Sequence, residues 1–328
     1  MIKLDLGPEP PELKAQRDVL LPLAIRAFNV HDHGSKELNE ILDEGYRVAR
    51  PTLMHRQYGK CAFCENLEDH ESRPVEHFRP KKEAHDDSSG SVVAVTSHYW
   101  WLAWTWSNLY FSCIKCNKQG NKGSRFTIKT GTLRAAAPSK PLADPIPESF
   151  YDFSAESALL VDPRFDEPLD HLQWIPVDST APRATWRWTI EGLSDKGTET
   201  IRIFGLKDRI DRVNGYLQDL TETAIEIDKH LAGARLSDAR EAFGRLVARY
   251  VNTADRPFRN AGYWALAALY PAASRASNGF CDLPRPCVSE RKGPLPDPQP
   301  VKVKKQAKPA KTAKTAKAAK PTKATPVP

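Results

Sequence analysis

Two Cys-x-x-Cys pairs constrain the fold of this 328-residue chain more than any other feature of its sequence. The first pair lies in CAFC, the second lies in CIKC, and 48 residues separate them. Two such pairs have the ligand spacing of a tetrahedral zinc site, in which four thiolates leave no coordination position for a substrate. We therefore expect a structural Zn²⁺ held by Cys61, Cys64, Cys113 and Cys116. The alternative is four unrelated buried cysteines.

The formal net charge of +7 is distributed unevenly along the chain. Nine lysines and no acidic residue lie between Val301 and Pro328, so residues 1–300 carry a net charge of −2. Any basic groove in the folded part must therefore be local. The repetitive Lys, Ala, Pro and Thr composition beyond Gly293 predicts a disordered C-terminal tail.

The remaining cysteines and the hydropathy indicate the cellular compartment of the protein. Cys281 and Cys287 lack ligand spacing and are interpreted as incidental thiols of a reducing compartment. No stretch approaches the roughly 18 apolar residues of a membrane span. We therefore expect a cytoplasmic protein without a membrane segment.

Helical periodicity at both ends of the chain, with short extended runs between, predicts a mainly helical α+β fold. Helices are expected over 11–30, 35–50, 198–232, 237–251 and 257–270, with Pro22 as a kink and Pro51 as a stop. Between about 139 and 189, runs such as ALLVDPRF and TWRWTIEGL favour a few strands. The expected segments are an N-terminal helical layer (1–57), a metal-held core (58–130), a connecting segment with a C-terminal helical layer (131–275), and a linker with the tail (276–328). The aromatic run HYWWLAWTW is interpreted as core.

An acid and an imidazole stand side by side in VEHFRPKK, between the two cysteine pairs. These residues are Glu76 and His77. Taken alone, such a stretch is typical of a solvated loop of mixed charge. Histidine has the side-chain pKa nearest neutrality, so His77 is a candidate general base. Two amides lie close to the second pair, Asn108 in WSNL and Asn117 directly after the last cysteine.

Together these motifs resemble the HNH endonucleases, the ββα-metal family, in the variety whose finger is held by two Cys-x-x-Cys pairs. YGKCAFCE, VEHFRPK, YWWLAWTWSNLYFSCIKCN and LLVDPRFDEPLDHLQW are similar to the HNH proteins that accompany an ATPase in Septu-type and some retron antiphage systems. The resemblance covers roughly residues 50–215. It implies a ββα-metal finger over 58–130, hydrolysis of phosphodiester bonds in DNA, a role in antiphage defence and an ATPase partner.

The resemblance also implies a role for each polar residue of these motifs. His77 would be the general base, Glu76 and Asn117 would bind a catalytic Mg²⁺ or Mn²⁺, and Asn108 would hold the loop of His77 by hydrogen bonds. The lysines expected to meet DNA phosphates are Lys81, Lys118 and Lys122.

Other interpretations of the same residues stay open. Asn108 is compatible with a simple turn amide, and Asn117 with a helix cap. The family more often has Asp where this chain has Glu76, which favours a zinc-held nucleic-acid-binding or adaptor protein without catalytic activity. A third interpretation is a zinc-held scaffold that does not contact nucleic acid.

Overall fold

The computed structural model describes residues 1–31, 34–68, 74–86, 93–95, 99–118 and 120–289. The chain divides into one unit from Met1 to Leu295 and a second from Pro296 to Pro328. The second unit, and with it the predicted tail, lies outside the described residues. In the first unit the buried apolar side chains form one continuous core. No helix among the described residues is long and apolar enough to cross a bilayer.

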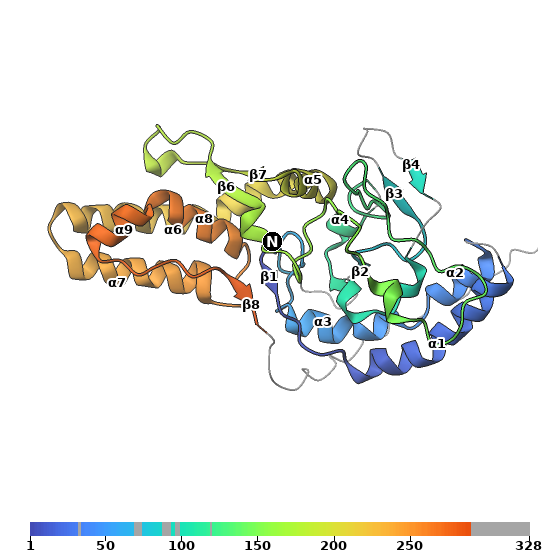
Figure 1. Ribbon diagram of the computed structural model, residues 1–328. Coiled ribbons are helices and arrows are strands. Elements are labelled where there is room, and N and C mark those ends of the chain that lie inside the picture. Colours follow the sequence, from blue (N-terminus) through green and yellow to red (C-terminus); the bar gives the residue numbers. More distant parts are fainter. Residues whose placement is uncertain (32–33, 69–73, 87–92, 96–98, 119, 290–328) are drawn as a thin grey trace, which may run out of the picture. The chain divides into compact units, whose positions relative to one another are not determined.

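The N-terminal part contains α1 (Pro11–Val30), α2 (Lys36–Leu42), the 3-10 turn η1 (Tyr46–Ala49) and α3 (Arg50–Arg56), drawn in blue in Figure 1. Helix α1 confirms the prediction over 11–30 and continues through Pro22. The predicted helix over 35–50 is wrong in its length, because α2 ends at Leu42 and the chain turns at Gly45. Gly45 has a φ of 73°, and a Cβ there would lie 2.3 Å from Leu20 Cδ1. Pro51 lies in the first turn of α3, where its missing N–H leaves no helical hydrogen bond unmade.

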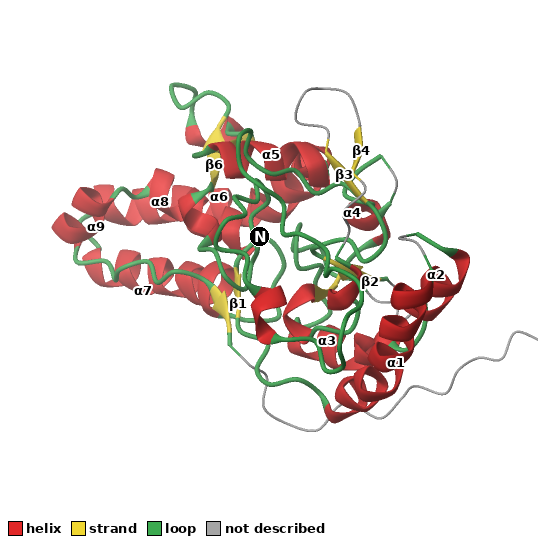
Figure 2. Ribbon diagram, turned by 45° about the vertical axis from the view of Figure 1, so that its right-hand side comes forward, coloured by secondary structure: helices red, strands yellow, loops and turns green. Residues whose placement is uncertain are grey.

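Two strands and a short helix lie between the N-terminal helices and the C-terminal helices, as Figure 2 also shows. They are β2 (Val75–His77), β5 (Leu109–Phe111) and α4 (Ile114–Asn117). β2 and β5 are antiparallel, with Glu76 opposite Tyr110 and His77 opposite Leu109. Every residue of both strands is buried, so the pair is covered on both faces.

The insert between β2 and β5 contains a second antiparallel pair and two 3-10 turns. These are β3 (Ala84–Asp86), β4 (Val93–Val95), η2 (Trp100–Leu102) and η3 (Trp106–Asn108). The indole rings of the predicted aromatic core are buried, which confirms that interpretation; they belong to Trp100, Trp101, Trp104 and Trp106.

The middle of the chain is only partly as predicted. β6 (Leu172–Pro176) and β7 (Trp188–Gly192) form an antiparallel pair, and β7 lies within TWRWTIEGL. ALLVDPRF is wrong as a strand, because its described residues form loop and turns apart from one bridge between Ile128 and Ala158. The short 3-10 turns of this segment are η4 (Glu148–Tyr151), η5 (Pro168–Asp170) and η6 (Arg183–Thr185).

The C-terminal helices lie on two sides of β6 and β7: the first lies near α4, and the others pack together at the opposite end (Figure 1). They are α5 (Asp195–Phe204), α6 (Ile210–Ala232), α7 (Leu236–Val247) with a π-helical turn (Ala248–Asn252), α8 (Arg259–Leu269) and α9 (Ala272–Asn278). The single helix predicted over 198–232 is wrong, since Gly205 with φ 58° ends α5 and the turn η7 (Leu206–Arg209) precedes α6. The last strand, β8 (Cys287–Val288), pairs in parallel with β1 (Lys3–Leu4).

Candidate functional site

Four cysteine sulfurs meet in one buried cluster. Their Sγ atoms all lie within 4.8 Å of one another, and Cys64 Sγ is 3.8 Å from Cys113 Sγ. Thiolates about 2.3 Å from a tetrahedral zinc ion are about 3.8 Å from each other. The donor set and its spacing therefore fit Zn²⁺, and the predicted ligands come together as expected: Cys61, Cys64, Cys113 and Cys116.

Short backbone motifs present these sulfurs. Cys61 N donates to Asn66 O and closes the first turn, and Ala62 N donates to a carbonyl of β5. Cys113 is the N-cap of α4, and its Sγ accepts a hydrogen bond from Cys116 N at 3.3 Å. The cluster therefore joins the turn after α3 to the junction of β5 and α4.

Arg209 contacts this centre, although nothing in its local sequence indicates that it does. It lies at the end of η7 and is 4 % exposed. Its Nη2 lies 3.7 Å from Cys113 Sγ and 3.6 Å from Cys116 Sγ. Burial acts to lower the pKa of Arg209, but the charge of Cys64 and the other thiolates overcomes it, so the pKa is raised. Four thiolates around Zn²⁺ carry a net charge of −2, which this guanidinium offsets in part.

Glu76, the central residue of β2, forms a buried ion pair with Lys122. Lys122 Nζ lies 2.8 Å from Glu76 Oε1, 2.9 Å from the carbonyl oxygen of His77 and 3.3 Å from that of Gly123. Lys122 is 0 % exposed and Glu76 is 5 % exposed. Burial raises the pKa of Glu76 and the charge of Lys122 only partly counteracts it. An ammonium group therefore occupies an oxygen-lined position where the resemblance implies a divalent cation.

His77 ends β2 and is 7 % exposed. Its Nε2 lies 2.9 Å from the carbonyl oxygen of Ala103, so Nε2 carries the proton and Nδ1 is the basic nitrogen. The Tyr46 ring packs edge-on against the imidazole, with 4.7 Å between ring centroids. Burial, with the positive charges of Lys81 and Lys122, lowers the pKa of His77 to about 3. The imidazole is therefore neutral at neutral pH.

Asn108 fixes the turn after His77. Its Oδ1 accepts from Arg79 N at 2.8 Å, and its Nδ2 donates to Arg79 O at 3.0 Å. These hydrogen bonds fit both the role that the resemblance implies for Asn108 and that of a simple turn amide. Asn117 is the last residue of α4, whose N-cap is Cys113, so its alternative role as the N-cap is wrong. Among the hydrogen bonds of the described residues, none joins the side chains of Asn117 and Glu76.

The three lysines predicted to meet phosphates lie in different environments. Lys118 follows α4 and is exposed. Lys122 is enclosed with Glu76. Lys81 Nζ lies 2.7 Å from Asp43 Oδ1, in the turn after α2. In this structure the exposed member of the set is therefore Lys118.

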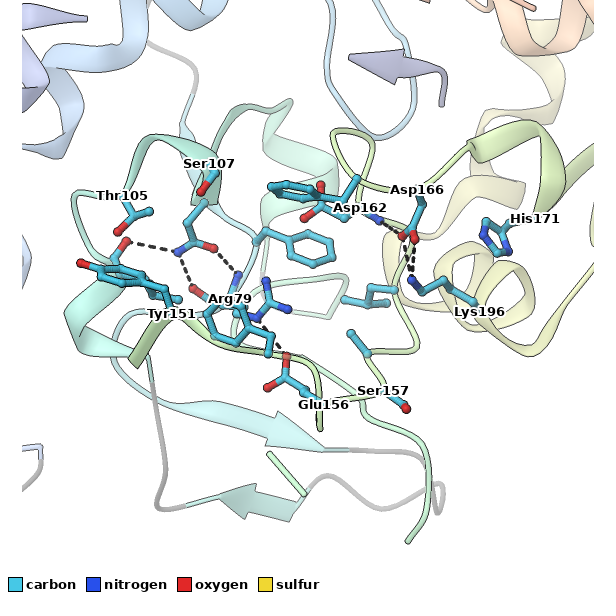
Figure 3. A pocket seen from close by; sticks show the side chains of 17 residues that line it. Arg79, Thr105, Ser107, Tyr151, Glu156, Ser157, Asp162, Asp166, His171 and Lys196 are labelled. Carbon is cyan, nitrogen blue, oxygen red and sulfur yellow. Dashed lines mark hydrogen bonds and ion pairs between the residues drawn. The ribbon is translucent and has the colours of Figure 1, made fainter. Parts of the chain in front are cut away.

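A pocket of about 650 Å³ is lined in part by Leu102, Thr105, Ser107 and Asn108, from the segment that precedes β5 (Figure 3). Two ion pairs line it. Arg79 Nε donates to Glu156 Oε1 at 2.9 Å, and Lys196 Nζ donates to Asp166 Oδ2 at 2.7 Å. The charged groups of these two pairs therefore neutralise each other within the pocket wall.

Comparison with known proteins supports one part of the resemblance, the similarity to Septu proteins. No protein-family model matches the chain, and no solved structure matches it. The chain is similar to the Septu protein PtuB of Bacillus mycoides, with 30 % identity over 174 residues. The aligned region covers 53 % of this chain and 48 % of that protein, so this chain matches about half the length of the relative. The similarity supports the resemblance to Septu proteins.

Proposed function

We propose that this chain is an HNH endonuclease that hydrolyses phosphodiester bonds in DNA, in antiphage defence and with an ATPase partner. The observation that carries the proposal is the order of polar residues on a strand, strand and helix unit. His77 ends β2, Asn108 directly precedes β5, and Asn117 ends α4. The four-cysteine cluster joins the turn after α3 to the junction of β5 and α4, and β5 pairs with β2. The similarity to the Septu protein PtuB supports the defence role.

His77 is the residue that we assign as general base. Since Ala103 holds the Nε2 proton, Nδ1 remains to accept a proton from the attacking water. An imidazole with a pKa of about 3 is a weak base. Contact with water would return that pKa toward about 6.5. Cleavage in this proposal therefore requires that the Tyr46 side chain moves away from His77, so that the imidazole can contact water and substrate.

The resemblance implies Mg²⁺ or Mn²⁺ as the cofactor of cleavage, with Glu76 as one ligand. With Lys122 Nζ at 2.8 Å from Glu76 Oε1, the residues around this carboxylate fit one ammonium and not an additional divalent cation. Two cations at one buried carboxylate repel each other. Zn²⁺, in contrast, fits the four cysteines as a structural ion.

A second candidate function is a zinc-held nucleic-acid-binding or adaptor protein without catalytic activity. The buried Glu76–Lys122 ion pair favours it, because the pair satisfies within the protein the carboxylate that a nuclease would use. The two candidates predict different results with a plasmid substrate.

The test is nicking of supercoiled plasmid by the zinc-loaded full chain with Mg²⁺, with Mn²⁺ and without added ion. We expect His77→Gln to reduce the rate by roughly two to four orders of magnitude, the usual effect of losing a general base. Gln retains most of the volume and a donor for the carbonyl of Ala103. The matched control is His85→Gln on β3, whose ring contacts Glu83 at 3.2 Å, and it should nick like wild type.

Two outcomes count against the nuclease assignment. Equal nicking by wild type and His77→Gln would remove His77 from the chemistry. The absence of nicking by wild type under all ion conditions, with duplex binding retained, would favour the adaptor function.

A further inference from the structure

One carboxylate bridges two lysines close to His77. Lys81 Nζ lies 2.7 Å from Asp43 Oδ1, and Lys82 Nζ lies 2.7 Å from Asp43 Oδ2. Each oxygen of the carboxylate thus accepts from one ammonium group. Two non-bridging oxygens of a phosphodiester present the same pair of acceptors with the same negative charge.

The surroundings of this bridge are positively charged, and the ring of Tyr46 separates them from His77. Lys81 Nζ is 4.6 Å and the Arg47 guanidinium carbon is 5.0 Å from the centroid of the Tyr46 ring. The same ring packs against His77. Lys81 and Lys82 contact the carboxylate of Asp43, and Arg47 Nη1 donates to the backbone carbonyl of Asp43 at 3.2 Å. These three cations carry more charge than the one carboxylate between the lysines, so an anion is attracted here even while Asp43 is in place.

We propose that Lys81 and Lys82 form a clamp for a phosphate of the DNA backbone, and that Asp43 occupies this clamp in the free protein. The proposal rests on the proposed function and names the first contact of its substrate. Lys81 was expected to meet phosphate from the sequence; Lys82 and the role of Asp43 come from the contacts described above.

The exchange of Asp43 for phosphate requires movement of side chains but not of the backbone. The Asp43 side chain is 48 % exposed and can rotate into water, and Lys82 is 37 % exposed. The backbone turn stays in place, because Gly45 is packed against Leu20 of α1 without room for a Cβ. Binding therefore breaks a partly exposed ion pair with Lys82 and a more buried one with Lys81, whose side chain is 11 % exposed, and forms two new ones with phosphate.

The test is equilibrium binding of a labelled DNA duplex to the full chain, measured by fluorescence anisotropy over a salt series without added divalent ions. Asp43→Asn frees both lysines, so we expect roughly 2- to 10-fold tighter binding at low salt, from the usual strength of exposed ion pairs. We also expect a log–log salt slope steeper by up to about 1.8, because two more lysines then release counterions. Lys82→Ala should weaken binding and flatten the slope by about 0.9.

Matched controls separate the clamp from a change of net charge. Asp219→Asn breaks the surface ion pair with Arg249 at 2.8 Å and changes the charge as Asp43→Asn does. Lys14→Ala breaks the surface pair with Asp18 at 2.6 Å and matches Lys82→Ala. Melting temperature and zinc content, measured for each variant, establish that it is folded.

The outcomes distinguish the clamp from the nuclease activity. If Asp43→Asn and Lys82→Ala bind duplex like their controls while wild type nicks plasmid, the clamp is overturned and the nuclease stands. If Asp43→Asn tightens binding beyond Asp219→Asn and wild type nicks nothing, the clamp is supported and the nuclease is overturned. A chain that binds no duplex at the lowest salt overturns both.

Discussion

His77 lies where the fold disfavours a positive charge. Cations approach it from three parts of the chain: Lys81 from the segment after β2, Lys122 from the segment after α4, and Arg47 from η1. The carbonyl oxygen of Ala103 is the polar group that counteracts them. Protonation of this buried ring would therefore add charge to an environment that is already positive.

The stability of the protein should consequently depend on His77 at mildly acidic pH. The pKa of His77 is about 3 in the folded chain and about 6.5 in an unfolded one. Between these values the unfolded state binds more protons, so stability is complete above pH 6.5 and is lost as the pH falls toward 3. Between pH 7 and pH 5, wild type should lose roughly 2 kcal/mol more unfolding free energy than His77→Gln. Urea unfolding at both pH values measures this difference, and equal losses would show that His77 is not held neutral.

The elements around the metal centre are too short to be stable alone. β2 and β5 have three residues each and α4 has four, far below the length at which isolated strands or helices persist in water. Structural zinc in small fingers contributes roughly 10 to 16 kcal/mol of binding free energy to folding. With zinc bound, the four-cysteine cluster would therefore help to hold β5 and α4 against the turn after α3.

Arg209 should influence how tightly this centre holds zinc. Arg209→Gln removes the guanidinium from Cys113 and Cys116, and loss of such an outer partner typically lowers metal affinity by about 10- to 100-fold. Arg245→Gln breaks only the exposed pair with Glu241 on α7 and serves as the control. Competition with a chromogenic zinc chelator measures both affinities. Equal affinity in the two variants would mean that the guanidinium does not stabilise the metal-bound thiolates.

The sequence predicts the local elements of this fold, but it does not predict the partners of the polar side chains. Helix α1 follows from its apolar period, and the cysteine ligands follow from their spacing. Strand alternation predicts that Glu76 and His77 point to opposite faces, but not what covers each face. Lys122 covers Glu76 from 46 positions away in the sequence. Tyr46 covers His77 from 31 positions away. Arg209 is 93 positions from Cys116, and nothing in its local sequence marks it.

At the scale of the whole chain, the charge is divided between a body of −2 over residues 1–300 and nine lysines beyond Val301. If the chain binds DNA as proposed, a duplex would meet local contacts such as the proposed clamp and non-specific contacts from the lysine-rich segment. The first kind can position a phosphate near His77. The second kind can only raise encounter and retention.

Truncation after Gly293 should separate these contributions. We expect weaker duplex binding and a flatter salt dependence, by about 0.9 in the log–log slope for each lost phosphate contact. The chemical step at saturating substrate should not change, since the truncation leaves His77 and its surroundings intact. Salt series on both proteins give the slopes. Identical slopes would leave the lysine-rich segment as a solubility tail.

The contact of Arg209 with the zinc ligands has a consequence for how such a protein can evolve and be engineered. A fragment of residues 58–130 would lose the guanidinium at 3.6 Å from Cys116 Sγ. It would also lose Phe28 of α1, whose ring centroid lies 4.8 Å from that of Trp100. Residues 58–130 therefore do not form a self-contained unit, because two distant parts of the chain complete their packing. Transfer of this segment into another protein would require a host that supplies both contacts.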